Sequence, residues 1–189
     1  MVKKNYVCQI HAISHIELRA QEQGFLENIY VDDGQFVKKG ELLFQIMPKL
    51  YEAEVQKASA EVDFAKIEYN NTKRLADSNI VSMNQLAMAK AKLDKAQAEL
   101  SLARVHLGFT EIRAPFDGII DRFHVRLGSL LEDGELLTSL SDNSQMWVYF
   151  NVSEAEYLDF QSNRKKGSLL KVELLMANGK PFKYPGVVE

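Results

Sequence analysis

The sequence is poor in cysteine. Cys8 is its only cysteine, so no disulfide bond can form within the chain. The residues around it, Tyr6–Ile10, alternate between apolar and polar side chains as in a strand. We therefore expect Cys8 to be a buried structural thiol rather than a lipid-bearing or catalytic one.

Long apolar runs are also missing. Stretches such as Leu42–Phe44 are far shorter than the ~20 residues that a transmembrane helix needs, so the sequence predicts no membrane-spanning helix. Lys3 and Lys4 begin the chain with charge, but no apolar signal core follows them. We expect that any targeting peptide has been removed or lies outside this chain.

The chain lacks an excess of positive charge. Its net charge is −3 and its pI is about 5.9, which gives no basic field to hold a phosphate backbone. The two basic clusters, Lys38–Lys39 and Arg164–Lys166, lie beside Gly40 and Gly167. We interpret both as solvated turn charge, so no nucleic acid is expected as a partner.

Residues for catalysis or metal binding are not grouped. The four histidines, His11, His15, His106 and His124, fall on unlike segments, and no glycine-rich phosphate loop is present. Met83 and Met88 come closest to a soft-metal cluster, and ordinary packing explains them better. We expect no catalytic residue, no metal and no cofactor.

An internal repeat is the most informative feature that is present. Residues 17–46 align without a gap on residues 111–140, an offset of 94, with ten identities in thirty positions. Each copy consists of short strands separated by glycines at turns that need a positive φ. The structural glycines so identified are Gly24, Gly34, Gly40, Gly118, Gly128 and Gly134. A unit this short is marginal alone, so the copies should pair about a pseudo-twofold axis as a flattened β-sandwich.

A helical segment separates the two copies. From Met47 to Thr110 the apolar period changes from two to about three and a half, and Pro48 marks the junction. Alanines occupy many of the alternate seam positions, which lets two helices approach closely. The larger residues of the predicted seam are Val55, Val62, Tyr69, Leu86, Leu93 and Leu100. The sequence therefore predicts an antiparallel hairpin of two helices, each about 25 residues and about 40 Å long.

The turn of this hairpin has a distinctive composition. Ser82 is placed to cap the second helix, and Gln85, three residues later, completes a capping box. Apolar residues surround the turn, where a lone soluble hairpin gains little from exposing them. They suggest a docking surface, with a local cap over the turn as the equally weighted alternative. The candidate contact residues at this tip are Leu75, Ile80, Val81, Ser82 and Met83.

The last part of the chain returns to strand patterns. Met146–Val152 alternates, Ser153–Glu156 is a second capping box opening a short helix, and Leu169–Met176 alternates again. Asn178–Gly179 is the strongest hairpin signal, with Lys183–Val188 as the return strand. These strands are too few to close a barrel. We expect the sheet to be incomplete here, with Tyr6–Ile16 joining it from the amino end.

Taken together, these features resemble one family along nearly the whole chain. The residues that carry the resemblance are Gly24–Leu43, Ile112–Gly118, Arg126–Leu137 and Trp147–Phe150, together with the split repeat and its helical insertion. The chain is similar to the periplasmic adaptor, or membrane fusion, proteins of resistance-nodulation-division (RND) efflux pumps. Any one of these segments alone would be a weak signal, but the combination is specific.

The resemblance implies an α+β fold that is elongated and modular. It consists of a lipoyl-like β-sandwich split by an antiparallel coiled-coil hairpin, with a partial β-barrel domain. Residues 1–16 would form a strand joining the β-barrel domain, and 142–189 the incomplete barrel domain itself. Residues 17–46 and 111–141 would be the two lipoyl-like halves, and 47–110 the hairpin.

The resemblance also implies a function and partners. Such an adaptor, usually a hexamer, links an inner-membrane transporter to an outer-membrane channel in the periplasm and exports drugs or other small molecules. An inner-membrane anchor is expected in the full-length protein and is absent from this chain. Family members carry a tip motif of arginine, leucine four residues later and serine seven after that. Leu75 and Ser82 match it, but Asn71 stands where arginine is expected.

Alternatives come from the same class and from another. Type I secretion adaptors and metal-efflux adaptors share the lipoyl and coiled-coil parts. A biotinyl or lipoyl carrier domain is the remote alternative, because it presents a modified lysine at the turn between its halves. Here a 64-residue insertion occupies that place, and the nearest lysine, Lys49, follows a proline.

Overall fold

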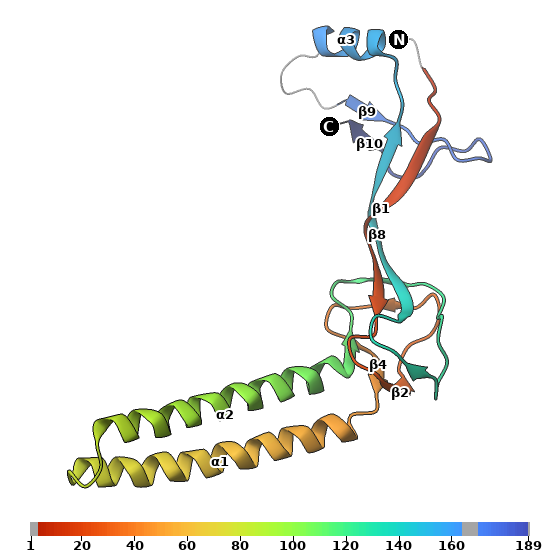
Figure 1. The fold of residues 1–189 in the computed structure, drawn as a ribbon. Coiled ribbons are helices and arrows are strands. Elements are labelled where there is room, and N and C mark those ends of the chain that lie inside the picture. Colours follow the sequence, from red (N-terminus) through yellow and green to blue (C-terminus); the bar gives the residue numbers. More distant parts are fainter. Residues whose placement is uncertain (1–3, 164–169, 189) are drawn as a thin grey trace. The chain divides into compact units, whose positions relative to one another are not determined.

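The computed structural model describes residues 4–163 and 170–188 of the chain. The chain divides into two compact units. The larger unit consists of His11–Trp147, and the smaller unit consists of Met1–Ile10 together with Val148–Glu189. Two long paired strands, β1 (Cys8–Arg19) and β8 (Leu136–Phe150), belong in part to each unit (Figure 1). The boundaries expected after residues 16 and 141 therefore lie inside continuous strands.

The larger unit contains two four-stranded sheets. Their strand orders are β1-β8-β6-β3 and β5-β4-β2-β7, and every pairing whose register is known is antiparallel. The shorter strands are β2 (Gly24–Ile29), β3 (Phe36–Val37), β4 (Leu42–Ile46), β5 (Glu111–Arg113), β6 (Gly118–Ile120) and β7 (Leu130–Leu131). Each sheet takes strands from both copies of the repeat, so neither copy can form a sheet by itself.

The hydrogen bonds between the two copies join residues that are related by the same offset of 94 positions as the sequence repeat. The amide of Ala20 donates to the carbonyl of Glu135 at 2.9 Å, and its equivalent, the amide of Ala114, donates to Glu41 at 3.0 Å. The side chains repeat this exchange, because Arg19 donates to the carbonyl of Gly134 and Arg113 to that of Gly40. The two copies are therefore related by a pseudo-twofold axis.

Both copies contribute to a single hydrophobic core. Phe44 is fully buried and meets Phe123 edge to face, with ring centroids 5.3 Å apart. The fully buried aliphatic residues are Leu26, Val37, Leu43, Ile46, Ile120, Leu131, Leu137 and Leu140. Removing either copy would open this core to water.

One of the six predicted structural glycines has a different role. Five have positive φ, as the turn pattern predicts, but Gly118 does not. A Cβ atom at Gly118 would lie 2.7 Å from the carbonyl oxygen of Ser141 on the neighbouring strand β8. Glycine is required there because two backbones approach closely, so the turn interpretation was wrong at this position.

Two long helices lie between β4 and β5. They are α1 (Lys49–Asp77) and α2 (Met83–Phe109), and they run antiparallel and packed side by side (Figure 1). Both are somewhat longer than the sequence pattern predicts. No helix among the described residues is long and apolar enough to cross a membrane.

The smaller unit contains the short helix α3 (Glu154–Asn163) and the antiparallel pair β9 (Leu170–Val172) and β10 (Gly186–Val188). The amide of Glu156 donates to the Ser153 hydroxyl, as the second capping box predicts. The return strand is shorter than predicted, because only an isolated bridge between Leu175 and Pro181 continues the pair toward the turn. Residues 164–169, which include the second basic cluster, lie outside the described part.

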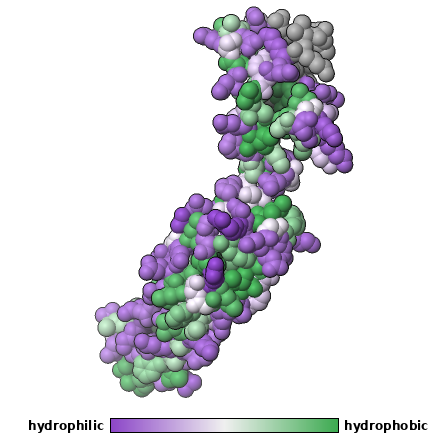
Figure 2. Space-filling view, turned by 90° about the vertical axis from the view of Figure 1, so that its right-hand side faces the viewer, coloured by the Kyte–Doolittle hydropathy of each residue, from purple (hydrophilic) through white to green (hydrophobic). Residues whose placement is uncertain are grey.

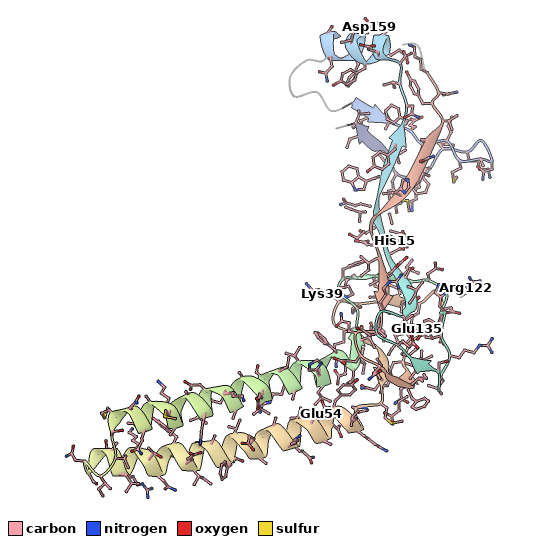
Figure 3. The ribbon with its side chains drawn as sticks, viewed as in Figure 1. His15, Lys39, Glu54, Arg122, Glu135 and Asp159 are labelled. Carbon is pink, nitrogen blue, oxygen red and sulfur yellow. The ribbon has the colours of Figure 1, made fainter. Side chains whose placement is uncertain are left out.

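Two further expectations concern strand β1. Cys8 is only partly buried, so the expectation of a buried thiol was wrong. The residues on either side of it, Val7 and Gln9, are exposed, so this end of the strand lies at the surface. Further along β1, Nδ1 of His15 lies 2.8 Å from the Ser141 hydroxyl on β8 (Figure 3), which makes this histidine structural.

We expect the β-sandwich to fold without the helices. Ile46 and Thr110 already meet, since the Ile46 amide donates to the Thr110 carbonyl at 2.8 Å. Replacing residues 47–109 with a short glycine turn should leave a soluble β domain, because a shorter loop costs less closure entropy. Thr110 is kept because it is buried and accepts two hydrogen bonds from Gln45.

Circular dichroism and limited proteolysis would test this variant. A strand spectrum with a protease-resistant fragment is the expected result. A chain digested as fast as an unfolded polypeptide would mean that the two copies depend on the helices to fold.

Candidate docking surface at the helix turn

The seam between α1 and α2 fixes the geometry of the candidate site. Ala65, Ala76, Ala89, Ala96 and Leu100 are buried along it. The predicted seam residues Val55, Val62, Tyr69, Leu86 and Leu93 are half-buried on the same faces. A two-helix seam is narrow, so its larger side chains remain partly in contact with water while the alanines between them are covered.

This difference in burial gives a graded prediction. Truncating the buried Leu100 to alanine should cost about 2–5 kcal/mol of the free energy of unfolding, and truncating the half-buried Leu93 should cost less. Hydrogen exchange in α1 and α2 should quicken in both variants while the β-sandwich keeps its protection. If hydrogen exchange quickened equally in the helices and in the β-sandwich, the two parts would not be independent modules.

The turn itself is closed by backbone hydrogen bonds. The Ile80 amide donates to the Leu75 carbonyl and the Asn79 amide to the Ala76 carbonyl, each at 2.9 Å. Asn79 has a φ of 55°, and this pattern is a Schellman motif ending α1. Asparagine tolerates the left-handed conformation that the motif needs, so the turn has a defined shape.

The start of α2 is capped as the sequence predicts. The Ser82 hydroxyl accepts from the Gln85 amide, and the Gln85 side chain accepts from the Ser82 amide, both at 3.2 Å. Only residues 78–82 separate the helices, and both ends of this turn are satisfied by its own backbone and side chains. The apolar side chains are therefore not needed to close it.

Those apolar side chains are largely in solvent. Ile80 is 69% exposed, Met83 is 72% exposed and Leu75 is 42% exposed, whereas Val81 is half-buried. Ser82 is exposed but is occupied as the helix cap. The turn thus presents an apolar surface of Leu75, Ile80 and Met83, which we call the tip surface. Exposed apolar residues grouped in this way suggest a protein contact.

A second cluster, at the other end of the helices, was missed by sequence reasoning. Nδ1 of His106 lies 2.5 Å from Oε1 of Glu22, and the Tyr51 hydroxyl donates to the Gln23 carbonyl at 2.8 Å. Burial raises the pKa of Tyr51, and the nearby Glu22 carboxylate raises it further. Glu54, one turn along α1 (Figure 3), adds to the same effect.

This cluster connects both helices to one loop of the sandwich. Tyr51 comes from α1, His106 from α2, and Glu22 and Gln23 from the loop between β1 and β2. It ties both helices to the β-sandwich where they leave it. No sequence signal could have revealed it, because His106 and Glu22 are 84 residues apart and neither belongs to a motif.

The described residues contain no cluster of metal-binding side chains. No group of three or more histidine, cysteine, aspartate or glutamate side chains among residues 4–163 and 170–188 could hold a metal ion. Lys49, the lysine considered for a carrier domain, is the first residue of α1 rather than part of a tight turn between strands. The tip surface therefore remains the strongest candidate.

Comparison with known proteins yields consistent matches. The sequence model of the family described as "RND MFP, barrel-sandwich hybrid domain" matches residues 14–141. The probable efflux pump periplasmic linker protein SepA of Pseudomonas putida is 31% identical over 92% of this chain. The efflux pump periplasmic linker BepD of Brucella suis is 29% identical over all of it. The chain spans about half the length of these curated relatives, 48% and 53% respectively.

Solved structures show the same fold. A chimeric MacA-MexA protein containing the Pseudomonas aeruginosa MexA α-hairpin domain is 28% identical, with a TM-score of 0.78 over 96% of this chain and 64% of that one. A putative efflux transporter from Bacteroides eggerthii has a TM-score of 0.76 over 99% of this chain and 59% of its own. Its 24% identity supports likeness of fold alone.

Proposed function

The chain belongs to the family of RND-type membrane fusion proteins, and on this premise we propose that it is the periplasmic adaptor of a tripartite efflux pump. The adaptor connects an inner-membrane transporter to an outer-membrane channel and acts by binding, not by catalysis. The match of residues 14–141 to the family carries this proposal, and the two relatives named above as efflux pump periplasmic linkers support it. The exported compounds are small organic molecules, in keeping with relatives named for toluene and antibiotic efflux.

We assign the parts of the chain accordingly. Residues 17–46 and 111–141 form a lipoyl-like domain, and residues 47–110 form a two-stranded coiled coil. Residues 1–16 and 142–189 belong to a β-barrel domain, which would explain why the smaller unit exposes apolar side chains such as Tyr149 and Tyr184. Figure 2 shows hydrophobic side chains at the surface of both units on the face that it draws. In the full-length protein an inner-membrane anchor and a hexameric arrangement complete the pump.

The tip surface is the proposed contact with the channel. Leu75, Ile80 and Met83 are exposed although the turn is closed without them, which supports docking over the alternative of a local cap. Asn71 is exposed on α1, four residues before Leu75, so an amide replaces the family's arginine on that face. Lys73 and Arg74 lie nearby and supply positive charge to the same end of α1.

Deleting the gene tests the proposed function. Cells without the protein should become more susceptible to drugs and dyes, and a plasmid copy of the full-length gene should restore resistance. Affinity purification from membranes should recover an inner-membrane transporter and an outer-membrane channel with the protein. Unchanged susceptibility together with secretion of a polypeptide would favour a type I secretion adaptor, and sensitivity to metal ions alone would favour a metal-efflux adaptor.

A further inference from the structure

The turn of the hairpin in the smaller unit contains a chemically labile pair of residues. Asn178 is the only asparagine in the sequence that is followed by glycine, and both Asn178 and Gly179 are exposed. The side-chain amide of an asparagine can be attacked by the backbone nitrogen of the next residue. Glycine allows this most easily, because it has no Cβ atom to hinder the approach. The pair is therefore a candidate site of chemical modification.

The hydrogen bonds of the turn define its conformation. The Gly179 amide donates to the Met176 carbonyl at 2.8 Å, and the Met176 amide donates to the Lys180 carbonyl at 2.9 Å. Gly179 has a φ of 74°. This is the pattern of a type I turn followed by a left-handed glycine, a common three-residue hairpin loop. The loop consists of Ala177, Asn178 and Gly179.

The side-chain amide of Asn178 is polarised within this turn. Its Oδ1 accepts a hydrogen bond from the backbone amide of Lys180 at 3.0 Å. Such a bond, from a side chain to the amide two residues later, folds the side chain over the intervening backbone of Gly179. It also stabilises the negative charge that develops on Oδ1 when a nucleophile adds to Cγ, as the donors of an oxyanion hole do.

The nucleophile, the backbone nitrogen of Gly179, is open to one side. A Cβ atom built on Gly179 would meet no atom within 4 Å beyond its chain neighbours. The attack is opposed by the hydrogen bond from the Gly179 amide to the Met176 carbonyl, which must break before the nitrogen can turn toward Cγ. The rate of reaction therefore depends on how often the turn opens.

This turn lies at a weak end of the hairpin. Between the turn and strands β9 and β10, the two chain segments are joined by an isolated bridge between Leu175 and Pro181. Proline has no amide hydrogen to donate to such a bridge. A two-stranded hairpin is at best marginally stable, so local opening should be frequent.

Two other asparagines show what is particular to Asn178. Asn143 is also followed by a small residue, but it lies within strand β8, and the Ser144 amide donates to the Asp142 carboxylate at 2.8 Å. Asn79 lies in the exposed helix turn, but it is followed by the β-branched Ile80, which hinders attack. Asn143 therefore provides an internal reference for the reactivity of Asn178.

We propose that Asn178 is a site of spontaneous deamidation. The Gly179 nitrogen bonds to Cγ of Asn178 and the bond from Cγ to Nδ2 breaks. Ammonia leaves with the proton of the Gly179 amide, and a five-membered succinimide ring remains. Water then cleaves one of two bonds of this ring. Cleavage of the new bond to Cγ gives aspartate, and cleavage of the original peptide bond gives isoaspartate. No oxidant, reductant or cofactor takes part.

Either product alters the hairpin. Aspartate places a new negative charge beside Lys180 on a chain whose net charge is already −3. Isoaspartate also inserts a methylene group into the main chain, so the hydrogen bonds among Met176, Gly179 and Lys180 cannot all be kept. The hairpin of the smaller unit should therefore loosen as the protein ages. This inference does not rest on the proposed adaptor function.

Ageing of the purified chain tests the proposal. The protein is incubated for days at neutral pH, digested and analysed by peptide mass spectrometry. The peptide with Asn178 should gain the mass that separates an amide from an acid, severalfold faster than the peptide with Asn143. Isoaspartate should be among the products, detected by methyl transfer from S-adenosylmethionine with an isoaspartyl methyltransferase.

Gly179→Ala is the matched variant. The left-handed φ strains an alanine there and loosens the turn, so opening alone would speed the reaction. The added Cβ atom hinders the nitrogen, so we expect conversion of Asn178 to become severalfold slower. Faster conversion in this variant would overturn attack by the Gly179 nitrogen, and so would formation of aspartate without isoaspartate.

The chain unfolded in denaturant supplies the second reference, because its Asn178 reacts without any turn. Conversion of Asn178 in the folded protein, severalfold above that of Asn143, supports the proposal. A folded chain that stays unmodified while the unfolded chain converts would mean that the turn protects Asn178, and would overturn it. Because no transporter, channel or cell is involved, failure here is distinct from failure in the resistance assay.

Discussion

Replacing Ile80 with aspartate should abolish the proposed efflux-dependent resistance to drugs and dyes, while the protein is still made and keeps its helix content. Ile80 is the second most exposed residue of the tip surface, and its backbone amide, not its side chain, closes the turn. A carboxylate at this position should leave the free protein intact but would have to be desolvated at the proposed apolar contact with the channel. The same loss is expected for Met83→Asp.

Drug susceptibility, channel crosslinking in cells and transporter binding are the measurements. Resistance should fall to the level of the deletion strain, crosslinking to the channel should disappear, and transporter binding should persist. Leu127→Asp is the matched control, since Leu127 is 64% exposed but lies on a turn of the β-sandwich. If Ile80→Asp and Met83→Asp both retain full resistance and full crosslinking, the tip surface is not the contact.

Three other tip substitutions need a stability measurement beside the activity assay. Val81→Asp and Leu75→Ser should also abolish resistance, but Val81 is half-buried and Leu75 is only 42% exposed. Ser82→Ala removes a helix cap, which costs roughly 0.5–2 kcal/mol by itself. Melting temperatures of the purified variants separate a lost contact from a loosened turn.

The repeat made much of the fold predictable. Residues such as Gly40 and Gly134 occupy equivalent turns, and each half of the repeat supplies half of every sheet, so the alignment was enough to predict that the two copies pair about a pseudo-twofold axis. The start of α2 at the helix turn could also be predicted from the sequence, because the capping box of Ser82 and Gln85 depends only on neighbouring residues. Local patterns and internal symmetry are the features that a single sequence records directly.

The remaining features depend on contacts between distant segments. Gly118 resembled a turn glycine, but its role comes from the Ser141 backbone 23 positions later. The contact of His106 with Glu22 joins segments that only the folded sandwich brings together. Strands β1 and β8 continue through both units, and no change of composition marks where one unit ends. Contacts of this kind between distant residues cannot be deduced from the periodicity of the sequence.

The symmetry of the core is broken at one position, and this leads to a second large effect. The equivalent of Phe44 under the offset of 94 is Thr138, and both are fully buried. Thr138 satisfies its hydroxyl by donating to the Asp121 carbonyl at 3.0 Å, while the Phe44 ring fills space beside Phe123. Phe44 therefore supplies core volume that no symmetry-related residue duplicates.

Replacing Phe44 with alanine should lower the free energy of unfolding of the β-sandwich by about 3–5 kcal/mol, because it removes a fully buried ring and leaves a cavity. Domains of this size are stable by only about 5–15 kcal/mol, so the variant should lose a large part of its stability. Phe25→Ala is the matched control, since Phe25 lies on the adjacent strand β2 and is 50% exposed.

Denaturant unfolding and hydrogen exchange measure the effect in the two copies of the repeat. Protection should fall together in β2 and β4 from the first copy and in β6 and β8 from the second, because the strands share one core and both copies contribute strands to each sheet. Loss of protection in the first copy alone would mean that the halves fold separately. That result would contradict the split-domain interpretation even though Phe44 itself is buried, since it would show that the second copy keeps its structure without the first.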